Sequence, residues 1–365
     1  MTSNERTRKL LLKHYTTYPK MQITDLFKFL HQSSFGCEHM ISSKDVSIEY
    51  IRREYSALKP TRESIPTIDR LDGAYSRVHL DCLNGGLTPE TLGTLFFLSA
   101  KNEPDGKRTL TEKLQVARKL ISDGNLNFDI SEFERKADEW QAQGFPAIHH
   151  SEIFRASYNP AYRVIDNRFL PLIPLFSAID KALAENTKNI IVAIDGGSAS
   201  GKTTLGSFLE KIYDCNIFHV DDFFLRPEQR TAERFAEAGG NFDRERFLEE
   251  ILLPLSKSQN VNYRRFDCST QSLSMPLTVP TKRLTIIEGA YSMHSSLAHL
   301  YDLSVYIDID AETQRERILK RNSPQLAQRF FNEWIPLELE YFSKMKVRER
   351  CDISISAIHN NNLEE

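Results

Sequence analysis

The spacing of apolar residues changes near residue 180. Before it, apolar residues recur at intervals of three and four, which predicts amphipathic helices. After it, short apolar runs alternate with helix-like segments, the order expected for a mostly parallel sheet covered on both faces. We therefore predict two domains, residues 1–180 and 181–365. The chain length of 365 residues agrees, because it exceeds what one hydrophobic core usually organises.

The first domain is predicted to be mainly helical and to have an accessory role that the sequence does not define. Residues 72–83 alternate and are expected to form a strand or an extended segment. Residues 144–166 are rich in turn residues and aromatics, and are expected to form an ordered connector. The predicted helices span residues 4–15, 23–32, 44–58, 89–99, 111–122 and 131–143, and a further helix begins near Pro174.

The second domain is predicted to be α/β, with a doubly wound parallel sheet. Its apolar runs are short and continuous, as in strands that are buried on both faces. The predicted strands are residues 189–195, 215–222, 283–289 and 303–310, and the predicted helices are residues 203–213, 243–253 and 311–321.

A glycine-rich stretch separates the first of these strands from the first of these helices. It fits G-x-x-x-x-G-K-[ST], a pattern that occurs by chance in such a chain roughly once in a hundred sequences or less. A strand before it and a helix after it are what a phosphate cradle needs, because glycines let backbone N–H groups face an anion at the positive end of the helix. The alternative is a simple turn that binds nothing. The predicted nucleotide contacts are Gly196, Gly197, Ser198, Ala199, Ser200, Gly201, Lys202, Thr203 and Thr204 in a P-loop NTPase fold.

Acidic residues end two of the predicted strands. Asp221 and Asp222 follow the second strand, and Glu288 ends the third. The carboxyl ends of parallel strands form the ligand-binding edge of such a sheet, so these side chains are expected beside the loop. One aspartate could accept the proton of an attacking hydroxyl, and Thr203, Asp221 and Glu288 could hold Mg²⁺. Helix capping or a solvated loop is the structural alternative.

Arginines recur on the predicted helix of residues 311–321. Arg317 and Arg321 lie four residues apart, which suits a phosphate clamp. A solvated face paired with Glu312 and Glu316 is an equally good interpretation.

These motifs occur in the order seen in uridine kinases. The glycine-rich loop is followed by "DDFF", "NFD", "YRRFDCSTQS", "IIEG" and an Asp-Ala-Glu-Thr run with arginines. The second half of the chain, residues 188–357, therefore resembles uridine kinases, with phosphoribulokinase and bacterial pantothenate kinase as similar relatives. The resemblance implies an ATP-dependent, Mg²⁺-requiring kinase for a small-molecule alcohol, with a uridine-like nucleoside as the first acceptor to consider.

The resemblance also assigns residues. It makes Asp221 the catalytic aspartate, with Asp222 in place of a serine, and Asp243 the acid that binds sugar hydroxyls. Phe266 stands where the family has a tyrosine near the base, and Gln271 where it has a histidine.

Further residues come from the lid and from the segment "YRRFDCSTQS". Arg317 and Arg321 fall on the helix that leads into the lid, where Arg317 is expected to stabilise the transferring phosphoryl group and Arg321 and Arg329 to contact phosphates. Arg264, Arg265, Asp267 and Gln271 together would suit a polar acceptor that carries an anionic group of its own. A sugar, a pantothenate-like compound or another polar alcohol is the next acceptor to consider after uridine. A plain hairpin turn is the structural alternative for this segment.

Composition narrows the alternatives. A net charge of −3 gives the chain no bulk basic character for nucleic acid or an anionic membrane, although it leaves local basic patches open, so an end kinase for nucleic acids ranks low. No apolar run is long enough for a transmembrane helix, and the apolar stretch near the N-terminus is too short for a signal peptide. The five cysteines form no C-x-x-C pair, which favours reduced thiols and a cytoplasmic location. A homo-oligomer is compatible with the sequence.

The first half contains two groups of candidate ligands, Cys37 with His39 and His149 with His150. Either could belong to a metal site or contain a nucleophile, but packing and capping are the simpler roles, since two ligands do not make a site. The unfamiliar first half also leaves open a regulatory ATP-binding protein that has no metabolite acceptor.

Overall fold

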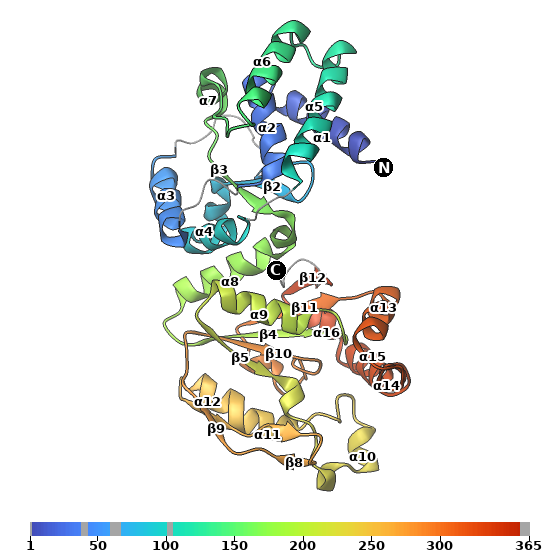
Figure 1. The fold of residues 1–365 in the computed structure, drawn as a ribbon. Coiled ribbons are helices and arrows are strands. Elements are labelled where there is room, and N and C mark those ends of the chain that lie inside the picture. Colours follow the sequence, from blue (N-terminus) through green and yellow to red (C-terminus); the bar gives the residue numbers. More distant parts are fainter. Residues whose placement is uncertain (1, 38–42, 59–66, 101–104, 358–365) are drawn as a thin grey trace. The chain divides into compact units, whose positions relative to one another are not determined.

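The computed structural model describes residues 2–37, 43–58, 67–100 and 105–357 (Figure 1). Two compact units comprise residues 1–173 and 174–365. Helix α8 (Ile173–Glu185) packs with the second unit, where the Tyr213 hydroxyl donates to Asp180 at 2.9 Å and Arg283 donates to the Leu183 carbonyl at 2.7 Å. The division therefore comes at the first residue of α8, within about ten residues of the position near 180 that the sequence suggested.

The first unit combines helices with a small antiparallel sheet. The sheet has three strands in the order β1-β2-β3, with β1 at Ile68–Arg70, β2 at Tyr75–His79 and β3 at Tyr162–Asp166. All residues of β2 are buried. The α-helices are α1 (Ser3–Thr17), α2 (Ile23–Phe35), α3 (Lys44–Ser56), α4 (Pro89–Leu98), α5 (Gly106–Ser122), α6 (Ile130–Ala142) and α7 (Glu152–Tyr158), and short 3₁₀ turns are η1 (Leu80–Gly85) and η2 (Asn167–Leu172).

The expected connector of residues 144–166 is wrong in its second part. It contains α7, which Ser151 caps by accepting from the Phe154 amide, and then strand β3. The turn residues and aromatics of this segment hid the strand, because its partner β2 lies some eighty residues earlier and no local pattern shows the pairing. The mainly helical first domain is otherwise confirmed.

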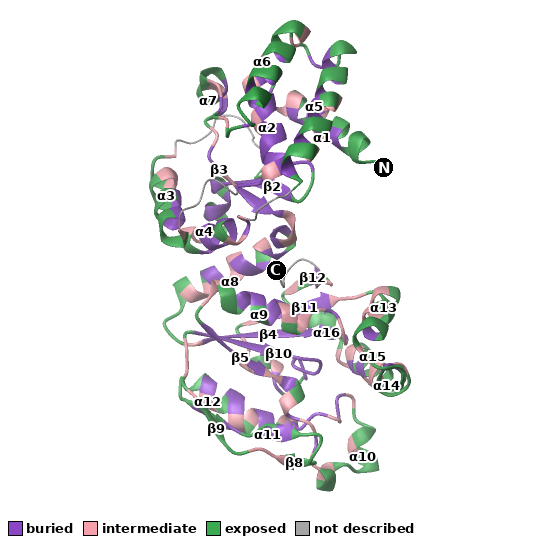
Figure 2. Ribbon diagram, viewed as in Figure 1, coloured by how far each residue is buried: buried purple, intermediate pink, exposed green. Residues whose placement is uncertain are grey.

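The second unit is built on a five-stranded parallel sheet in the order β12-β11-β4-β10-β5. The four predicted strands are present, as β4 (Ile190–Gly196), β5 (Cys215–His219), β10 (Leu284–Glu288) and β11 (Leu303–Asp308), and the edge strand β12 (Ile353–Ser356) joins them. Strands β4 and β10 are buried along their full length, as Figure 2 shows. The continuous apolar runs of the sequence therefore reflect burial on both faces.

Helices cover the two faces of this sheet (Figure 1). Helix α9 (Lys202–Ile212) packs against β4, β5 and β10 on one side. On the other side, Ile191, Ala193 and Ile287 join a core with residues of the helical segment 244–256. The doubly wound parallel sheet of a P-loop fold is confirmed.

The remaining elements of the second unit lie in the segments that connect the strands of this sheet. A short hairpin region contains β6 (Val261–Tyr263), β7 (Phe266–Asp267), β8 (Ser272–Leu273) and β9 (Leu277–Val279). The helical elements are η3 (Val220–Asp222), η4 (Pro227–Gln229), α10 (Ala232–Phe235), α11 (Arg244–Phe247), η5 (Leu248–Leu252), α12 (Leu253–Ser256), η6 (Ala298–Leu300), α13 (Ala311–Arg321), α14 (Pro324–Arg329), η7 (Phe330–Trp334), α15 (Ile335–Met345) and α16 (Val347–Arg350).

The cysteines are unpaired, and Cys37, Cys82 and Cys215 are buried. Burial raises the pKa of the Cys37 thiol to about 12, so it is not a reactive thiolate. Within the described ranges, no helix has both the length and the apolar character needed to cross a membrane.

Candidate active site

The glycine-rich loop lies between the end of β4 and the start of α9, as the sequence predicts. Gly196 has φ +149°, and a Cβ there would lie 2.5 Å from the Ile307 carbonyl oxygen, so a larger residue cannot fit. Gly201 caps α9 with φ +104°, a conformation that favours glycine. The first amides of α9 are thus left without helical partners beside the loop, which is the arrangement that binds phosphate.

Lys202 reaches back across this loop. Its Nζ donates to the Gly196 carbonyl at 2.8 Å and to the Gly197 carbonyl at 3.0 Å. The ammonium group is therefore held at the loop, where it can serve a bound phosphate as a point charge.

Glu288 connects the loop to the neighbouring strand end. It is buried at the end of β10, and its Oε1 accepts from the Thr203 hydroxyl at 3.0 Å. The same oxygen lies 2.5 Å from Nδ1 of His219, the last residue of β5. A hydroxyl and a carboxylate are oxygen donors of the kind Mg²⁺ prefers, and Mg²⁺ usually takes one or two carboxylates together with nucleotide phosphates. Thr203 and Glu288 therefore fit a magnesium site. Among the residues that the structure describes, no group of three or more His, Cys, Asp or Glu could hold a metal ion without such help.

The contact with Glu288 gives a pH-dependent prediction for His219. The hydrogen bond that His219 donates to Glu288 raises the pKa of His219, and this outweighs the opposing effect of burial. In a histidine NMR titration, His219 is expected to titrate above the ordinary value of about 6.5. The ion pair stabilises the folded state below that ordinary value, and its contribution is lost as the pH rises through the raised pKa. Glu288→Gln should remove the upward shift, and an unchanged titration in this variant would contradict the pairing.

Asp221 and Asp222 lie side by side in η3, directly after β5, but they differ in their surroundings. The protein around Asp221 raises its pKa, and the positive charge of Lys202 opposes this. Asp221 is solvent-accessible, whereas Asp222 is partly buried and forms an ion pair with Arg265, with 3.1 Å between Oδ2 and Nε. Burial also raises the pKa of Asp222, and Arg265 opposes that effect. Asp221 therefore lies within the electrostatic influence of Lys202, and Asp222 pairs with Arg265 of the hairpin region.

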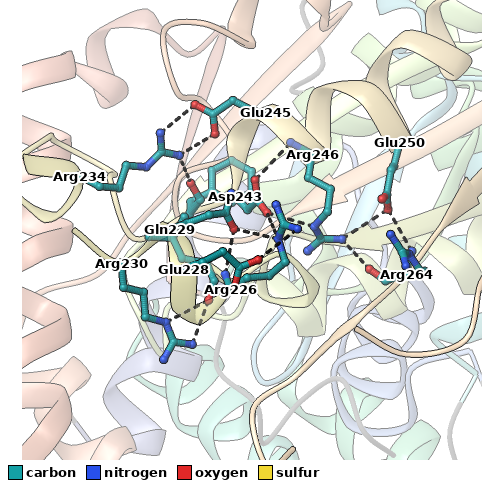
Figure 3. Close-up of polar contacts among 12 residues, drawn as sticks. Arg226, Glu228, Gln229, Arg230, Arg234, Asp243, Glu245, Arg246, Glu250 and Arg264 are labelled. Carbon is teal, nitrogen blue, oxygen red and sulfur yellow. Dashed lines mark hydrogen bonds and ion pairs between the residues drawn. The ribbon is translucent and has the colours of Figure 1, made fainter. Parts of the chain in front are cut away.

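Asp243 is buried and paired inside the protein. Its Oδ1 accepts from the Arg246 amide at 3.3 Å, which caps α11, and its Oδ2 accepts from Arg246 Nε at 3.2 Å. Arg246 also donates to the Arg264 carbonyl at 2.6 Å, and Figure 3 shows this network together with Arg226. In this structure Asp243 organises the segment behind the hairpin, and its role as a ligand for sugar hydroxyls stays a prediction.

The hairpin region does not bring all of its predicted residues to the site. Asp267 Oδ1 accepts from the Ser269 amide at 2.8 Å, and Gln271 Nε2 donates to the Cys268 carbonyl at 2.6 Å. Both are exposed and satisfied within their own turn, as the structural alternative expects. Phe266 is buried, and the Arg230 guanidinium lies 5.6 Å from the centre of its ring. Of this segment, Arg265 is the residue that contacts the strand-end aspartates.

The arginines of α13 and α14 have separate environments. Arg317 donates to the Ala199 carbonyl at 3.0 Å, and Gln314 donates to the Ser198 carbonyl at 2.9 Å, so α13 supports the loop through its carbonyl groups. Arg321 is exposed on the last turn of α13. Arg329 pairs with Glu333 at 3.2 Å, within its own helical segment. A phosphate contact for these arginines stays a prediction.

Glu338 was missed by sequence reasoning. It lies on α15, is buried, and accepts from both the amide of Ser198 at 2.9 Å and its hydroxyl at 2.5 Å. Both donors of Ser198, a predicted nucleotide contact, are thus engaged by this carboxylate. One helical turn later, Tyr341 donates to Asp195 Oδ2 at 2.7 Å. The three-residue spacing of Glu338 and Tyr341 is a sign of a shared helix face, but it says nothing of a loop some 140 residues earlier.

The candidate ligands of the first half differ in their burial and contacts. His150 is buried and contacts Asp25 and Tyr162, whereas His149 is exposed. Cys37 is buried against the Phe96 carbonyl, and His39 lies outside the described residues.

Part of the second half of the chain is similar to known proteins. Residues 191–326 match the profile of the Phosphoribulokinase / Uridine kinase family. A uridine kinase of Macrococcus caseolyticus is 29% identical over 144 residues, which are 37% of this chain and 68% of that protein. A uridine kinase of Chlamydia pneumoniae is 27% identical over 141 residues, 36% of this chain and 62% of that protein. The solved structure of a possible uridine kinase from Bacillus stearothermophilus has 23% identity and a TM-score of 0.37, and covers 50% of this chain and 99% of that one.

Proposed function

We propose that the protein transfers the γ-phosphate of ATP to a hydroxyl group of a small molecule, since residues 191–326 match the profile of the Phosphoribulokinase / Uridine kinase family. The observation that carries this proposal is the position of Asp221. Asp221 follows β5 at the same edge of the sheet at which the glycine-rich loop follows β4. Lys202 lowers the pKa of Asp221, whereas Glu288 raises it.

Each residue then has a definite role. The loop amides and the start of α9 bind the phosphates, and Lys202 balances the charge that moves onto the transferring group. Asp221 accepts the proton from the acceptor hydroxyl as that oxygen forms its bond to phosphorus. Mg²⁺, held by Thr203 and Glu288, would neutralise phosphate charge when bound. Arg317 and Glu338 act through the loop, because both contact its backbone.

Uridine is the first acceptor to test, since the relatives named above are uridine kinases. A second class of acceptor has support from the hairpin region. Arg265 is half-exposed beside Asp222, and Arg230 lies over Phe266, so cationic groups surround the position where the resemblance expects a base. A sugar or pantothenate-like alcohol with a carboxylate or phosphate of its own would complement these charges.

ADP release that depends on an acceptor tests the proposal. The protein with Mg-ATP would be given nucleosides, sugars, sugar phosphates, polyols, pantothenate and hydroxy acids, with Lys202→Ala as the blank. One acceptor should stimulate ADP release and gain the mass of a phosphoryl group. ATP binding without stimulation by any of these compounds would instead support a regulatory ATP-binding protein.

Arg265→Gln separates the two classes of acceptor. If the acceptor carries an anionic group, its KM should rise about tenfold or more with little change in kcat, because the lost charge acts on binding. Arg264→Gln is the matched control, since Arg264 is the exposed neighbour whose backbone, rather than its side chain, contacts Arg246. Steady-state kinetics with the acceptor found above would measure both, and equal KM values for Arg265→Gln and the unmodified protein would favour a neutral acceptor.

A further inference from the structure

One face of the small sheet in the first unit carries polar side chains where a core would place apolar ones. Asp69 on β1 lies opposite Arg77 on β2, and His79 lies opposite Tyr162 on β3. Residues opposite each other in an antiparallel pair share a face, as do alternate residues of one strand. These four side chains therefore point to the same side of the sheet.

Helices α1 and α2 cover this face with further polar groups. His14 on α1 and Gln32 on α2 are both buried, and the exposed fraction of the Arg77 residue is only 1%. Arg77 Nε donates to Gln32 Oε1 at 2.9 Å, and its NH1 lies 3.5 Å from Asp69 Oδ2 and 3.4 Å from His14 Nε2. We refer to His14, Gln32, Asp69, Arg77, His79 and Tyr162 as the Arg77 cluster.

Three side-chain nitrogens of the Arg77 cluster are buried without a hydrogen-bond partner among the described residues. One of them, Nδ1 of His14, lies 3.4 Å from Asp69 Oδ2. The other two are NH2 of Arg77 and Nε2 of His79. The Arg77 guanidinium carbon lies 4.8 Å from the centre of the Tyr162 ring, and the His79 ring centre lies 5.5 Å from it, so both groups lie against one aromatic ring. Buried polar groups are nearly always paired, and a charged donor left unpaired is especially costly. A stable core would not retain this arrangement for packing alone, since apolar residues of similar volume usually replace buried ion pairs without loss.

The protonation states define what these atoms can bind. Burial lowers the pKa of His79 to about 4, so its ring is neutral near pH 7 and can donate one hydrogen bond. Burial alone would raise the pKa of Asp69, but His14 and Arg77 lower it to about 2, so this carboxylate is ionised. The free edge of a guanidinium prefers a charged oxygen as acceptor.

We propose that the Arg77 cluster is a second ligand-binding site, in which Arg77 NH2 and His79 Nε2 bind an oxyanion of a small molecule, either a carboxylate or a phosphate. The site is independent of the proposed kinase activity, because every residue in it belongs to the first unit. A neighbouring pair extends it, since His150 links the Tyr162 hydroxyl at 2.7 Å to Asp25 at 2.8 Å and thereby fixes the orientation of Tyr162.

Histidine NMR of the full chain tests the site directly. The protein would be labelled with ¹⁵N in its ten histidines and saturated with Mg-ADP, so that the loop of the second unit does not take up the probe. Inorganic phosphate and acetate would be titrated separately, with His79→Gln used to assign the signal. The His79 signal should shift saturably with at least one probe, whereas exposed His149 should not, and the tighter probe distinguishes a phosphate from a carboxylate ligand.

Variants measure the part played by the guanidinium. Arg77→Lys keeps the charge but loses the planar fork, so the Kd for the probe should rise about tenfold or more. Arg163→Lys is the matched control on the same sheet, because Arg163 pairs with Glu54 outside the Arg77 cluster, and it should bind as the unmodified protein does. If Arg77→Lys does not fold by circular dichroism, the titration of the unmodified protein decides. No saturable shift at His79, a shift shared with His149, or an unchanged Kd in folded Arg77→Lys would overturn the proposal.

Discussion

Asp221→Asn is expected to lower kcat for phosphoryl transfer by about 10²–10⁴-fold, the usual contribution of a general base, with little change in ATP affinity. The amide keeps the shape of the side chain but cannot accept the proton of the acceptor hydroxyl. The surrounding protein raises the pKa of Asp221. As the pH is lowered, kcat of the unmodified enzyme should therefore begin to fall at a pH above the ordinary aspartate pKa of about 3.9. Steady-state kinetics across pH, together with calorimetric measurement of ATP binding, would check both results.

Asp222→Asn is the matched control for this experiment. Asp222 also follows β5, but its side chain pairs with Arg265. Its substitution should therefore change mainly the KM for the acceptor. A larger loss of kcat in Asp222→Asn than in Asp221→Asn would reverse the assignment of the base. Near-normal kcat in both variants would remove general-base catalysis from this strand end.

Lys202→Ala is expected to lower kcat by about 10²–10³-fold and also to weaken ATP binding. The size follows from the loss of one charged donor aimed at the transferring group. The loop itself should change as well, since Lys202 donates to the Gly196 and Gly197 carbonyls and alanine removes both of these hydrogen bonds. The kcat value and the dissociation constant for ATP measure the two effects separately.

Lys211→Ala provides the comparison, because Lys211 is exposed on the last turn of the same helix. It should leave both constants close to those of the unmodified protein. If Lys202→Ala binds ATP and turns over as well as Lys211→Ala does, the glycine-rich loop is not the phosphate site.

Most of the sheet of the second unit could be predicted, because its central strands can be recognised from their own residues. Buried strands such as β4 and β10 are continuous apolar runs, and the glycine-rich loop identifies which strand precedes a phosphate site. Strand β12 was not predicted, since its alternating residues look like any exposed terminal segment and its pairing with β11 is a tertiary contact. Local pattern therefore predicts the centre of the sheet better than its edge.

The residues of the candidate site also differ in whether local sequence patterns predict them. The positions of Lys202, Thr203 and Glu288 follow from short motifs and from the parallel order of the strands. Glu338 could not be predicted, because its contact with Ser198 depends on how α15 packs against the loop. Gln271 was assigned by resemblance and Asp267 from the polar character of its segment, whereas the geometry of their own turn decides where their side chains point. The Arg77 cluster could not be predicted from the sequence either, since strand β3 was not predicted and only its pairing with β2 brings Tyr162 to His79.

The most direct test of the kinase assignment follows the γ-phosphate itself. ATP labelled with ¹⁸O in its γ-phosphoryl group would be incubated with the protein, Mg²⁺ and the acceptor that best stimulates ADP release, and the products would be analysed by mass spectrometry. The account predicts that the label appears in a phosphorylated acceptor, in amounts equal to the ADP formed, and that Asp221→Asn abolishes this product. Label found in inorganic phosphate, with no labelled acceptor, would contradict it.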